Sequence, residues 1–373
     1  MIEVREVKTK KERKQFVDFP LKLYKGNPYF VPPLYGDEMK LFNKNNLYCD
    51  QAEAVYYNAY RDGVMVGRIS GILQKASNEK WKQKRVRFTR FDSIDDQEVA
   101  DALFGAVENW AKSFGMEEVA GPLGFSDLDR EGLLIEGFDQ LSTFEEQYNY
   151  DYYQKLIENC GYGKEVDWVE RKLRAPKVID DRVPRISSMM LKKYNLRMGE
   201  AKNTKDFIKR YADGIFKLLD ESYDDLYMTV PFTEAMKNNM IANFKLIVDI
   251  RYVAVILDEN DKVVCFGLSF PAIGEAVQKS GGKLTVPTLF RVLKALKKPK
   301  VLDLALVGVA PEYKNKGVSS TLIWGVMEML TQNNLDHAET NLNLEDNYVI
   351  QNQFKIFDAE LHKRRRAFVK KIV

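Results

Sequence analysis

Apolar and polar residues follow the same order of patterns in the two halves of the chain. Alternating runs predict strands, and apolar residues at every third or fourth position predict helices. In the first half, a strand and a helix are followed by predicted elements at 52–61, 64–73, 85–91, 95–114, 118–120, 152–159 and 168–173. In the second half, a strand and two helices are followed by elements at 251–257, 263–270, 289–297 (a helical insert), 301–309, 319–330, 337–342, 348–357 and 362–372. Each half therefore contains a hairpin, then a strand, helix, strand, helix and strand, which predicts an α/β fold with a mixed sheet in two similar units.

A boundary between the two units is predicted near Pro176, because a proline ends regular structure. We expect an N-terminal unit at 1–175, a connector helix within 176–195 and a C-terminal unit at 196–373. The length of 373 residues suits two domains better than one.

The composition narrows the class of protein. Hydrophobic residues make up 45% of the chain and the net charge is only +3, so the charge balance indicates no nucleic-acid partner. Cys49, Cys160 and Cys265 lie far apart and leave one cysteine over after any pairing, which favours reduced thiols. Neither of the two histidines has metal-ligand spacing with a cysteine, so no metal site is expected. No apolar run is long enough to span a membrane and no signal core opens the chain, so we expect a cytoplasmic protein without a membrane partner.

The most informative segment is the end of the strand 301–309 and the turn after it. A proline, Pro311, ends the strand, a basic turn containing Gly317 comes next, and a helix opens at Ser319 and Ser320. This order aims backbone N–H groups, the positive end of a helix dipole and lysine charge at one point. A diphosphate is the kind of ligand that suits such a corner.

With this segment in place, the chain resembles the GCN5-related N-acetyltransferase (GNAT) superfamily, with two such folds in tandem, and it is similar to a bacterial two-domain subgroup. The resemblance covers the element order of both halves and is strongest at 301–373. The family's loop has Arg or Gln, two variable residues, Gly, one variable residue, then Gly or Ala. Here the loop is Lys314-Asn315-Lys316-Gly317-Val318-Ser319, so the central glycine fits and both ends depart from the pattern. The lead-in Val309-Ala310-Pro311 also fits. The resemblance implies an acyl-CoA-dependent N-acyltransferase, with acetyl-CoA as the expected cofactor and an amine of a small metabolite or peptide as the acceptor.

The resemblance also assigns roles to residues of the C-terminal unit. The coenzyme is expected to contact the strand end, the turn, the helix start and the residue that opens the last helix: Val307, Gly308, Val309, Lys314, Asn315, Lys316, Gly317, Val318, Ser319, Ser320 and Asn347. A backbone N–H near Val307–Val309 is expected to donate to the thioester carbonyl. Gly308 is expected to permit a bulge that splays the strands 301–309 and 337–342 apart.

The acceptor amine must lose a proton, because an ammonium group with a pKa of about 10.4 stays protonated near neutral pH. Glu339 is the candidate base for this step. Tyr223 and Tyr227 are candidates for recognition of the acceptor.

The first half departs from the family pattern at the corresponding turn. Between Phe91 and Ala100 the chain has no glycine and four acids, which are Asp92, Asp95, Asp96 and Glu98. Because acids repel a diphosphate, we expect the N-terminal unit to hold no coenzyme. It would instead support the C-terminal unit or shape the acceptor site.

Two other functions stay open at this point. The family often has a tyrosine seven residues after the asparagine at 347, where it protonates the leaving thiolate, but this chain has Phe354. That departure motivates a sensor that binds acyl-CoA without turnover. Aminoacyl-tRNA-dependent peptidyl transferases also join two such folds, although this chain has no sustained basic stripe to hold tRNA. The basic run at 362–366 alternates into apolar residues, so we expect it to guard an exposed sheet edge. Homodimer formation is left open by the sequence.

Overall fold

The computed structural model describes residues 1–43, 45–333 and 335–373. The first half contains β1 (Ile2–Glu6), α1 (Lys10–Leu23), α2 (Tyr35–Lys40), β2 (Ala52–Arg61), β3 (Val64–Gln74), α3 (Lys75–Trp81), β4 (Arg85–Ser93), α4 (Gln97–Ser113), β5 (Glu118–Gly121), β6 (Leu133–Glu136), α5 (Tyr152–Asn159) and β7 (Gly163–Arg174). The rest contains α6 (Arg182–Lys193), β8 (Arg197–Met198), α7 (Thr204–Tyr223), α8 (Glu234–Ile247), β9 (Val253–Leu257), β10 (Val263–Pro271), α9 (Gly274–Gln278), α10 (Val286–Lys297), β11 (Val301–Val309), α11 (Ser320–Gln332), β12 (His337–Thr340), β13 (Asn343–Leu344), α12 (Tyr348–Gln353) and β14 (Asp358–Lys371). Short 3-10 turns precede β9, follow β11 and follow α12.

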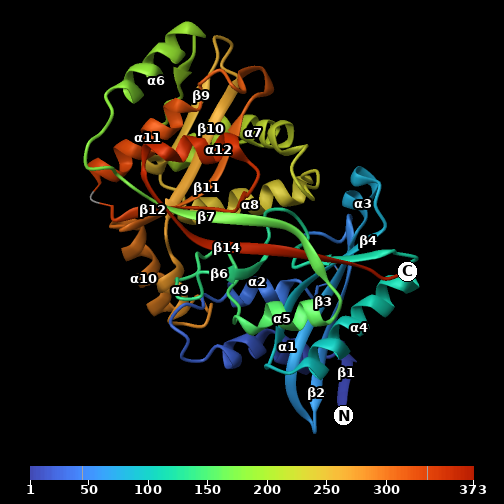
Figure 1. The fold of residues 1–373 in the computed structure, drawn as a ribbon. Coiled ribbons are helices and arrows are strands. Elements are labelled where there is room, and N and C mark those ends of the chain that lie inside the picture. The colour runs from blue at the N-terminus through green and yellow to red at the C-terminus, as the bar shows by residue number, and fades with distance from the viewer. Residues whose placement is uncertain (44, 334) are drawn as a thin grey trace.

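The described strands form one mixed sheet that passes through both halves (Figure 1). Its main path is β1-β2-β3-β4-β5-β14-β7-β12-β11-β10-β9-β8, with β6 paired to β14 and β13 paired to β7. The β4–β5 and β11–β12 pairs are parallel, and the neighbours of these pairs on the path are antiparallel. The predicted mixed sheet is therefore confirmed, and each half repeats the same parallel pair.

The two halves exchange strands at the centre of the sheet. Strand β7, which ends the first half in sequence, pairs with β12 of the second half, while β14 at the end of the chain pairs with β5 of the first half. The pairing between β7 and β14 themselves extends from Asp358↔Arg174 to Val369↔Gly163. Both strands cross the middle of the molecule in Figure 1. The predicted division at 175/176 stays a prediction, and it is a division in sequence that the hydrogen bonding of the sheet crosses.

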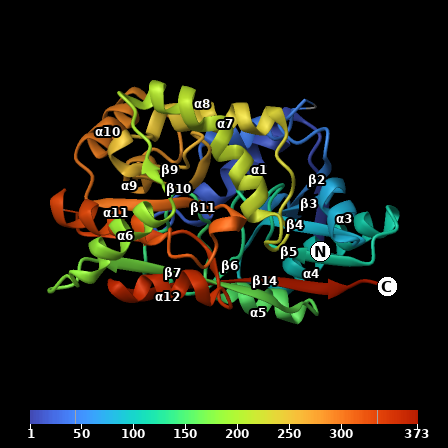
Figure 2. The ribbon, with the colours of Figure 1, turned by 90° about the horizontal axis from the view of Figure 1, so that it is seen from above.

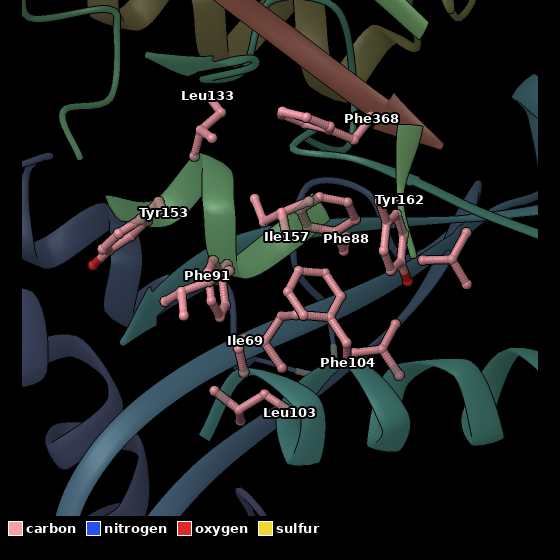
Figure 3. Packing of buried hydrophobic residues seen from close by; sticks show 14 of the residues in the cluster. Ile69, Phe88, Phe91, Leu103, Phe104, Leu133, Tyr153, Ile157, Tyr162 and Phe368 are labelled. Carbon is pink, nitrogen blue, oxygen red and sulfur yellow. The ribbon is translucent and has the colours of Figure 1, made fainter. Parts of the chain in front are cut away.

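The core of the first half depends on this exchange. Phe368 of β14 is fully buried among apolar residues of the N-terminal half, including Phe88, Ile157 and Tyr162 (Figure 3). A phenylalanine buried to this degree contributes about 1.5–3 kcal/mol by leaving water. Phe368 and Ile372 at the end of the chain therefore complete a core whose other buried members lie more than 200 residues earlier.

The expectation that residues 362–366 guard a sheet edge is wrong. Strand β14 has β7 on one side and β5 and β6 on the other, so it is an interior strand. Lys363 and Arg365 are 1% and 0% exposed and pair with the buried carboxylate of Glu170 at 3.3 and 2.6 Å. The alternation arises because both faces of β14 are packed. Lys363 and Arg365 lie on one face, which is polar and buried.

Helices cover both faces of the C-terminal part of the sheet. In Figure 2, α7, α8 and α10 lie on one side of β10 and β11, and α6, α11 and α12 lie on the other. The connector helix α6 packs against α11, where Ser187 donates to Thr321 at 3.1 Å. Within the part of the chain that the structure describes, no helix is both long enough and apolar enough to cross a membrane.

Candidate functional site

A cavity of about 900 Å³ lies where the two halves meet. The second half contributes the end of β11, the turn after it, the start of α12 and the apolar faces of α8 and α10. The first half contributes Tyr48 and an acidic set from two loops: Asp127, Asp129, Glu131, Glu145 and Glu146. One continuous space therefore joins the predicted diphosphate turn to carboxyl groups of the other half.

The cavity enters the sheet where β11 and β12 diverge. Their parallel register runs from Val301↔His337 to Leu304↔Thr340 and then ends, while β11 continues to Val309 beside β10 alone. The predicted splay of these strands is thus present. The prediction that Gly308 forms the bulge is wrong, because the register shift falls at Ala305 and Gly308 is paired regularly with Phe266. Gly308 is required for a different reason: a Cβ there would lie 2.3 Å from the Phe266 ring.

The divergence leaves backbone groups of β11 without a neighbouring strand. Ala310 donates to Val264 of β10, and the antiparallel alternation then turns the N–H groups of Val307 and Val309 away from β10. The Tyr223 hydroxyl at the end of α7 occupies this gap, donating to the Val307 carbonyl at 3.1 Å and accepting from its N–H at 3.4 Å. Burial raises the pKa of Tyr223 to about 12, so the phenol carries its proton at neutral pH. The Tyr223 hydroxyl therefore occupies the acceptor position of the Val307 N–H, which is one of the backbone groups that the sequence predicted to donate to the thioester carbonyl.

The turn between β11 and α11 presents a set of free N–H groups. Among the described residues, the backbone N–H groups of Asn315, Gly317, Val318 and Ser319 have no hydrogen-bond acceptor. Gly317 has a φ of +77°, which L-residues with a side chain rarely adopt, and its position turns the chain back into the helix. The side chain of Val318 is buried in the C-terminal core, and this packing anchors the turn to the core.

The start of α11 is left without a side-chain cap. Ser319 at the N-cap makes no capping hydrogen bond, and the Ser320 hydroxyl donates back to the Gly317 carbonyl at 2.6 Å. Most helix starts are capped by a side-chain oxygen that accepts from the first N–H groups. Free N–H groups, an uncapped helix dipole and a neighbouring lysine fit the diphosphate of a coenzyme A thioester.

The two lysines of the turn differ in direction. Lys314 is exposed and lines the cavity. The Lys316 ammonium instead lies over the rings of Tyr194 and Tyr313, at 5.5 and 5.7 Å from their centroids, and its side chain is absent from the cavity wall. The geometry favours Lys314 over Lys316 as a contact for an anion in the cavity.

The corresponding corner of the first half is occupied by the chain's own side chains. The carboxylate of Asp96 caps α4 by accepting from Glu98 N–H at 3.0 Å and pairs with Arg61 at 2.6 Å. Asp92 is buried and accepts from Arg68 at 2.7 Å and from the Tyr24 hydroxyl at 3.0 Å. That the first half holds no coenzyme stays a prediction, and these contacts favour it.

The acidic set in the cavity was not identified as a site from the sequence. Burial raises the pKa of Asp127 to about 6 and that of Glu146 to about 8, and it raises the pKa of Glu131 well above the usual range. Asp127 also acts electrostatically on Tyr223, which places it near the open end of β11. The signal in the sequence is a series of acids at 127–131 and 145–146 between apolar and aromatic residues, which resembles a solvated loop unless the fold is known.

Glu339, the predicted base, lies in a different environment. It does not line the cavity, and its carboxylate contacts Lys363 at 3.0 Å and His337 at 3.3 Å. Burial raises its pKa, but the hydrogen bond from His337 and the charge of Lys363 outweigh this effect and lower the pKa to about 2. Glu170, Glu339 and His362 lie close enough together for a metal ion, yet the Lys363 ammonium already occupies the space between the two carboxylates. The catalytic role of Glu339 stays a prediction, which this geometry does not favour.

The structure brings about half of the predicted coenzyme contacts to the cavity wall. These are Val307, Val309, Lys314, Asn315, Ser319 and Asn347, the last of which caps α12 by accepting from Ile350 N–H at 3.3 Å. Gly308, Lys316, Gly317, Val318 and Ser320 do not line the cavity. Tyr223 and Tyr227, predicted to recognise the acceptor, both line the cavity.

Comparisons with known proteins are consistent with this geometry. No protein-family model matches the chain. It is 28% identical over 385 residues to protein YghO of Escherichia coli K12, covering 99% of this chain and 95% of that protein. It is 29% identical over 285 residues to the bacterial ceramide synthase of Caulobacter vibrioides, covering 74% of this chain and 72% of that protein. Its fold is similar to that of a tandem GNAT protein from the clavulanic acid biosynthesis pathway, with a TM-score of 0.57, 10% identity and coverage of 100% of this chain and 99% of that one. The chain therefore has the tandem GNAT fold.

Proposed function

We propose that the protein is an acyl-CoA-dependent N-acyltransferase whose coenzyme is held by the C-terminal half. The observation that carries this proposal is the set of free N–H groups at residues 315–319, whose first and last residues, Asn315 and Ser319, line the same cavity as Val307 and the acidic set. When bound, the coenzyme supplies an acyl group activated as a thioester. The chain must then bind it, polarise its carbonyl and accept a proton from the attacking amine.

Val307 and Tyr223 are suited to the carbonyl and the leaving sulfur. The Val307 N–H points into the gap between β11 and β12 and donates to the Tyr223 hydroxyl. A thioester carbonyl oxygen that enters this gap can replace that hydroxyl as the acceptor. The displaced Tyr223 hydroxyl stays protonated, since its pKa is raised to about 12, and can donate to the sulfur. Tyr223 thus offers the proton that Phe354, buried in the core, cannot give.

Asp127 is suited to the proton of the amine. Its pKa of about 6 makes it ionised at neutral pH and more basic than an exposed aspartate. The ionised Asp127 carboxylate also attracts an ammonium group electrostatically. In this arrangement the N-terminal half binds and deprotonates the acceptor, and the C-terminal half holds the donor.

The wall of the cavity indicates the class of acceptor. Beyond the acidic set, the wall is mainly apolar along three elements: α8 contributes methionine, phenylalanine and isoleucine side chains beside two asparagines, and α10 and β11 contribute mostly leucine and valine. A relative named a ceramide synthase supports a long-chain amine or a long-chain acyl group as a substrate. Acetyl transfer to a small amine, which the sequence led us to expect, uses little of this volume and is the second candidate.

Thermal unfolding with acetyl-CoA and with a long-chain acyl-CoA tests the proposal. Saturation at 100 times the dissociation constant stabilises the folded protein by about 2.7 kcal/mol, which raises the melting temperature by several degrees. Lys314→Glu should abolish this rise, while the matched control Lys316→Glu should keep most of it because that side chain points to Tyr194 and Tyr313. If neither thioester stabilises the protein at millimolar concentration, the proposal is overturned.

A measurement of free thiol distinguishes an acyltransferase from a sensor that binds acyl-CoA without turnover. An acyltransferase should release coenzyme A thiol when a long-chain amine is added, and Tyr223→Phe should slow that release while leaving the thermal shift intact. Tight thioester binding without thiol release over a broad panel of amines would instead establish a sensor.

A further inference from the structure

The segment around α10 combines exposed apolar side chains with a strong positive charge. From Ala276 to Leu302 the chain contains no acid and seven basic residues: Lys279, Lys283, Arg291, Lys294, Lys297, Lys298 and Lys300. Five large apolar side chains of the same segment are exposed by 47–70%: Leu284, Val286, Leu289, Phe290 and Leu293. Leaving such side chains in water is costly unless another apolar phase covers them.

This surface forms the rim of the cavity. Leu284, Leu289 and Leu293 line the cavity and are also exposed, so each contacts both the interior space and the outside. Val292 and Leu296 continue the lining one turn further along α10. Helix α10 lies at the outer margin of the helix layer that includes α8 (Figure 2). The cavity therefore opens beside the exposed apolar face.

We infer that α10 lies in the surface of an anionic phospholipid membrane. A basic helix with one apolar face inserts that face at the boundary between headgroups and acyl chains, and its lysines contact anionic headgroups. Phe290 and Val286, 70% and 67% exposed, would enter the acyl boundary, while Lys294, Lys297 and Lys298 would remain at headgroup level. The sequence prediction of no membrane partner considers only spanning runs, which an interfacial helix does not need.

Charge favours this partner over a second copy of the chain. Two copies meeting through α10 would bring seven basic residues against seven basic residues, with no acid in the segment to balance them. An anionic bilayer neutralises these charges and covers the apolar face at the same time. The acidic set that could attract a basic partner lines the cavity and does not belong to this segment.

Membrane docking also explains how a long-chain substrate could reach the site. The rim places the apolar cavity beside the acyl region, so an amphiphile could slide from the bilayer with its chain against α10 and its amine toward Asp127. This second step rests on the proposed acyltransferase function, whereas the docking itself does not.

Flotation with lipid vesicles tests the docking without any measurement of activity. The full chain should float with vesicles of equal phosphatidylglycerol and phosphatidylcholine, float weakly with pure phosphatidylcholine, and dissociate as salt is raised. Phe290→Ser combined with Leu293→Ser should lower the partition coefficient by about tenfold or more, because two inserted apolar side chains are lost. Lys294→Glu combined with Lys297→Glu should reduce binding to anionic vesicles only.

Two controls keep the result interpretable. Val64→Ser removes a similarly exposed apolar side chain, 66% exposed, at the start of β3 and should leave flotation unchanged. Far-ultraviolet circular dichroism and the melting temperature report whether the α10 variants keep the fold. Absence of flotation with anionic vesicles, or equal flotation of the Phe290/Leu293 variant, would overturn the inference. Concentration-dependent dimers that form without lipid and disappear in that variant would also overturn it, in favour of a contact between copies.

Discussion

The two halves of the molecule contain the same corner, a strand leading into a helix beside a parallel neighbour, with opposite electrostatic content. In the first half, β4 leads to α4, and the helix start is capped by the Asp96 carboxylate. In the second half, β11 leads to α11; among residues 1–43, 45–333 and 335–373, no side chain caps the start of this helix and four N–H groups of the preceding turn have no acceptor. The positive end of a helix dipole attracts an anion at the start of either helix. At α4 the Asp96 carboxylate supplies that negative charge, whereas the start of α11 is available to an anionic ligand.

This difference shows how two copies of one fold in the same chain can use their polar groups for different purposes. The first half keeps the sheet geometry but uses its polar groups for structure, and its loops extend acids into the cavity between the two halves. The strand exchange links the two halves, because β7 and β14 join the part of the sheet beside the acids to the part that ends at the uncapped start of α11. Changes at the strand exchange, at the acidic set, at the buried ion pairs and at the start of α4 test this difference between the halves.

Removal of β14 should have the largest effect. A chain that ends at Phe357 loses Phe368 from the N-terminal core and leaves β5 and β7 with unpaired edges. We expect loss of cooperative unfolding in both halves, measured by circular dichroism and near-ultraviolet spectra. Deletion of Val373 alone, which is 83% exposed, is the control and should leave the melting curve unchanged. A truncated chain with an intact N-terminal core would show that the halves fold independently.

Asp127→Asn should lower the rate of acyl transfer by about 10²–10⁴-fold, because the amine loses its base. In the parent protein, kcat/KM should rise with pH up to about 6, where Asp127 becomes ionised, and this inflection should vanish in the variant. Thermal stabilisation by acyl-CoA should be unaffected, since Asp127 belongs to the other half. Equal pH profiles for the two proteins would show that the base lies elsewhere, with Glu339 as the next residue to substitute.

The buried pairs at the strand exchange should matter more than exposed pairs on the same strands. Glu170→Gln leaves the ammonium of Lys363 and the guanidinium of Arg365 without their shared carboxylate in a site that is 0% exposed, which should cost about 3–5 kcal/mol of unfolding free energy. The control Glu360→Gln breaks an exposed pair with Arg174 and should cost about 0–1 kcal/mol. Urea denaturation measures both, and similar losses would mean that the buried network adds little to the junction.

The sequence predicted the elements well and the joining of the halves poorly. Periodicity identified β11, α11 and the turn between them, because local hydrophobic order and a glycine encode that geometry. The alternation in β14 was correctly interpreted as a strand, but nothing local reveals that its partners lie more than 180 residues away or that its lysine and arginine are buried. The acids at 127–131 and 145–146 were missed for the same reason, since their burial depends on surfaces contributed by the other half. Gly308 was identified as important on the wrong grounds, because its role is the approach of the Phe266 ring rather than a bulge.

The smallest expected effect comes from removing the charge of Asp96 at the start of α4. Asp96→Asn removes the charge at the start of α4 and its ion pair with Arg61, but asparagine still caps a helix, so stability should fall by no more than about 1 kcal/mol. If the acid alone kept coenzyme away from the first half, this variant placed in the Lys314→Glu background would recover a thermal shift with acyl-CoA. We expect no recovery, because Asp92 and the Tyr153 hydroxyl, which accepts from Ser93 N–H at 3.1 Å, still fill the corner. A recovered shift would mean that the two halves differ by a single charge, whereas its absence would mean that the closed corner is built into the packing of α1, α5 and β4.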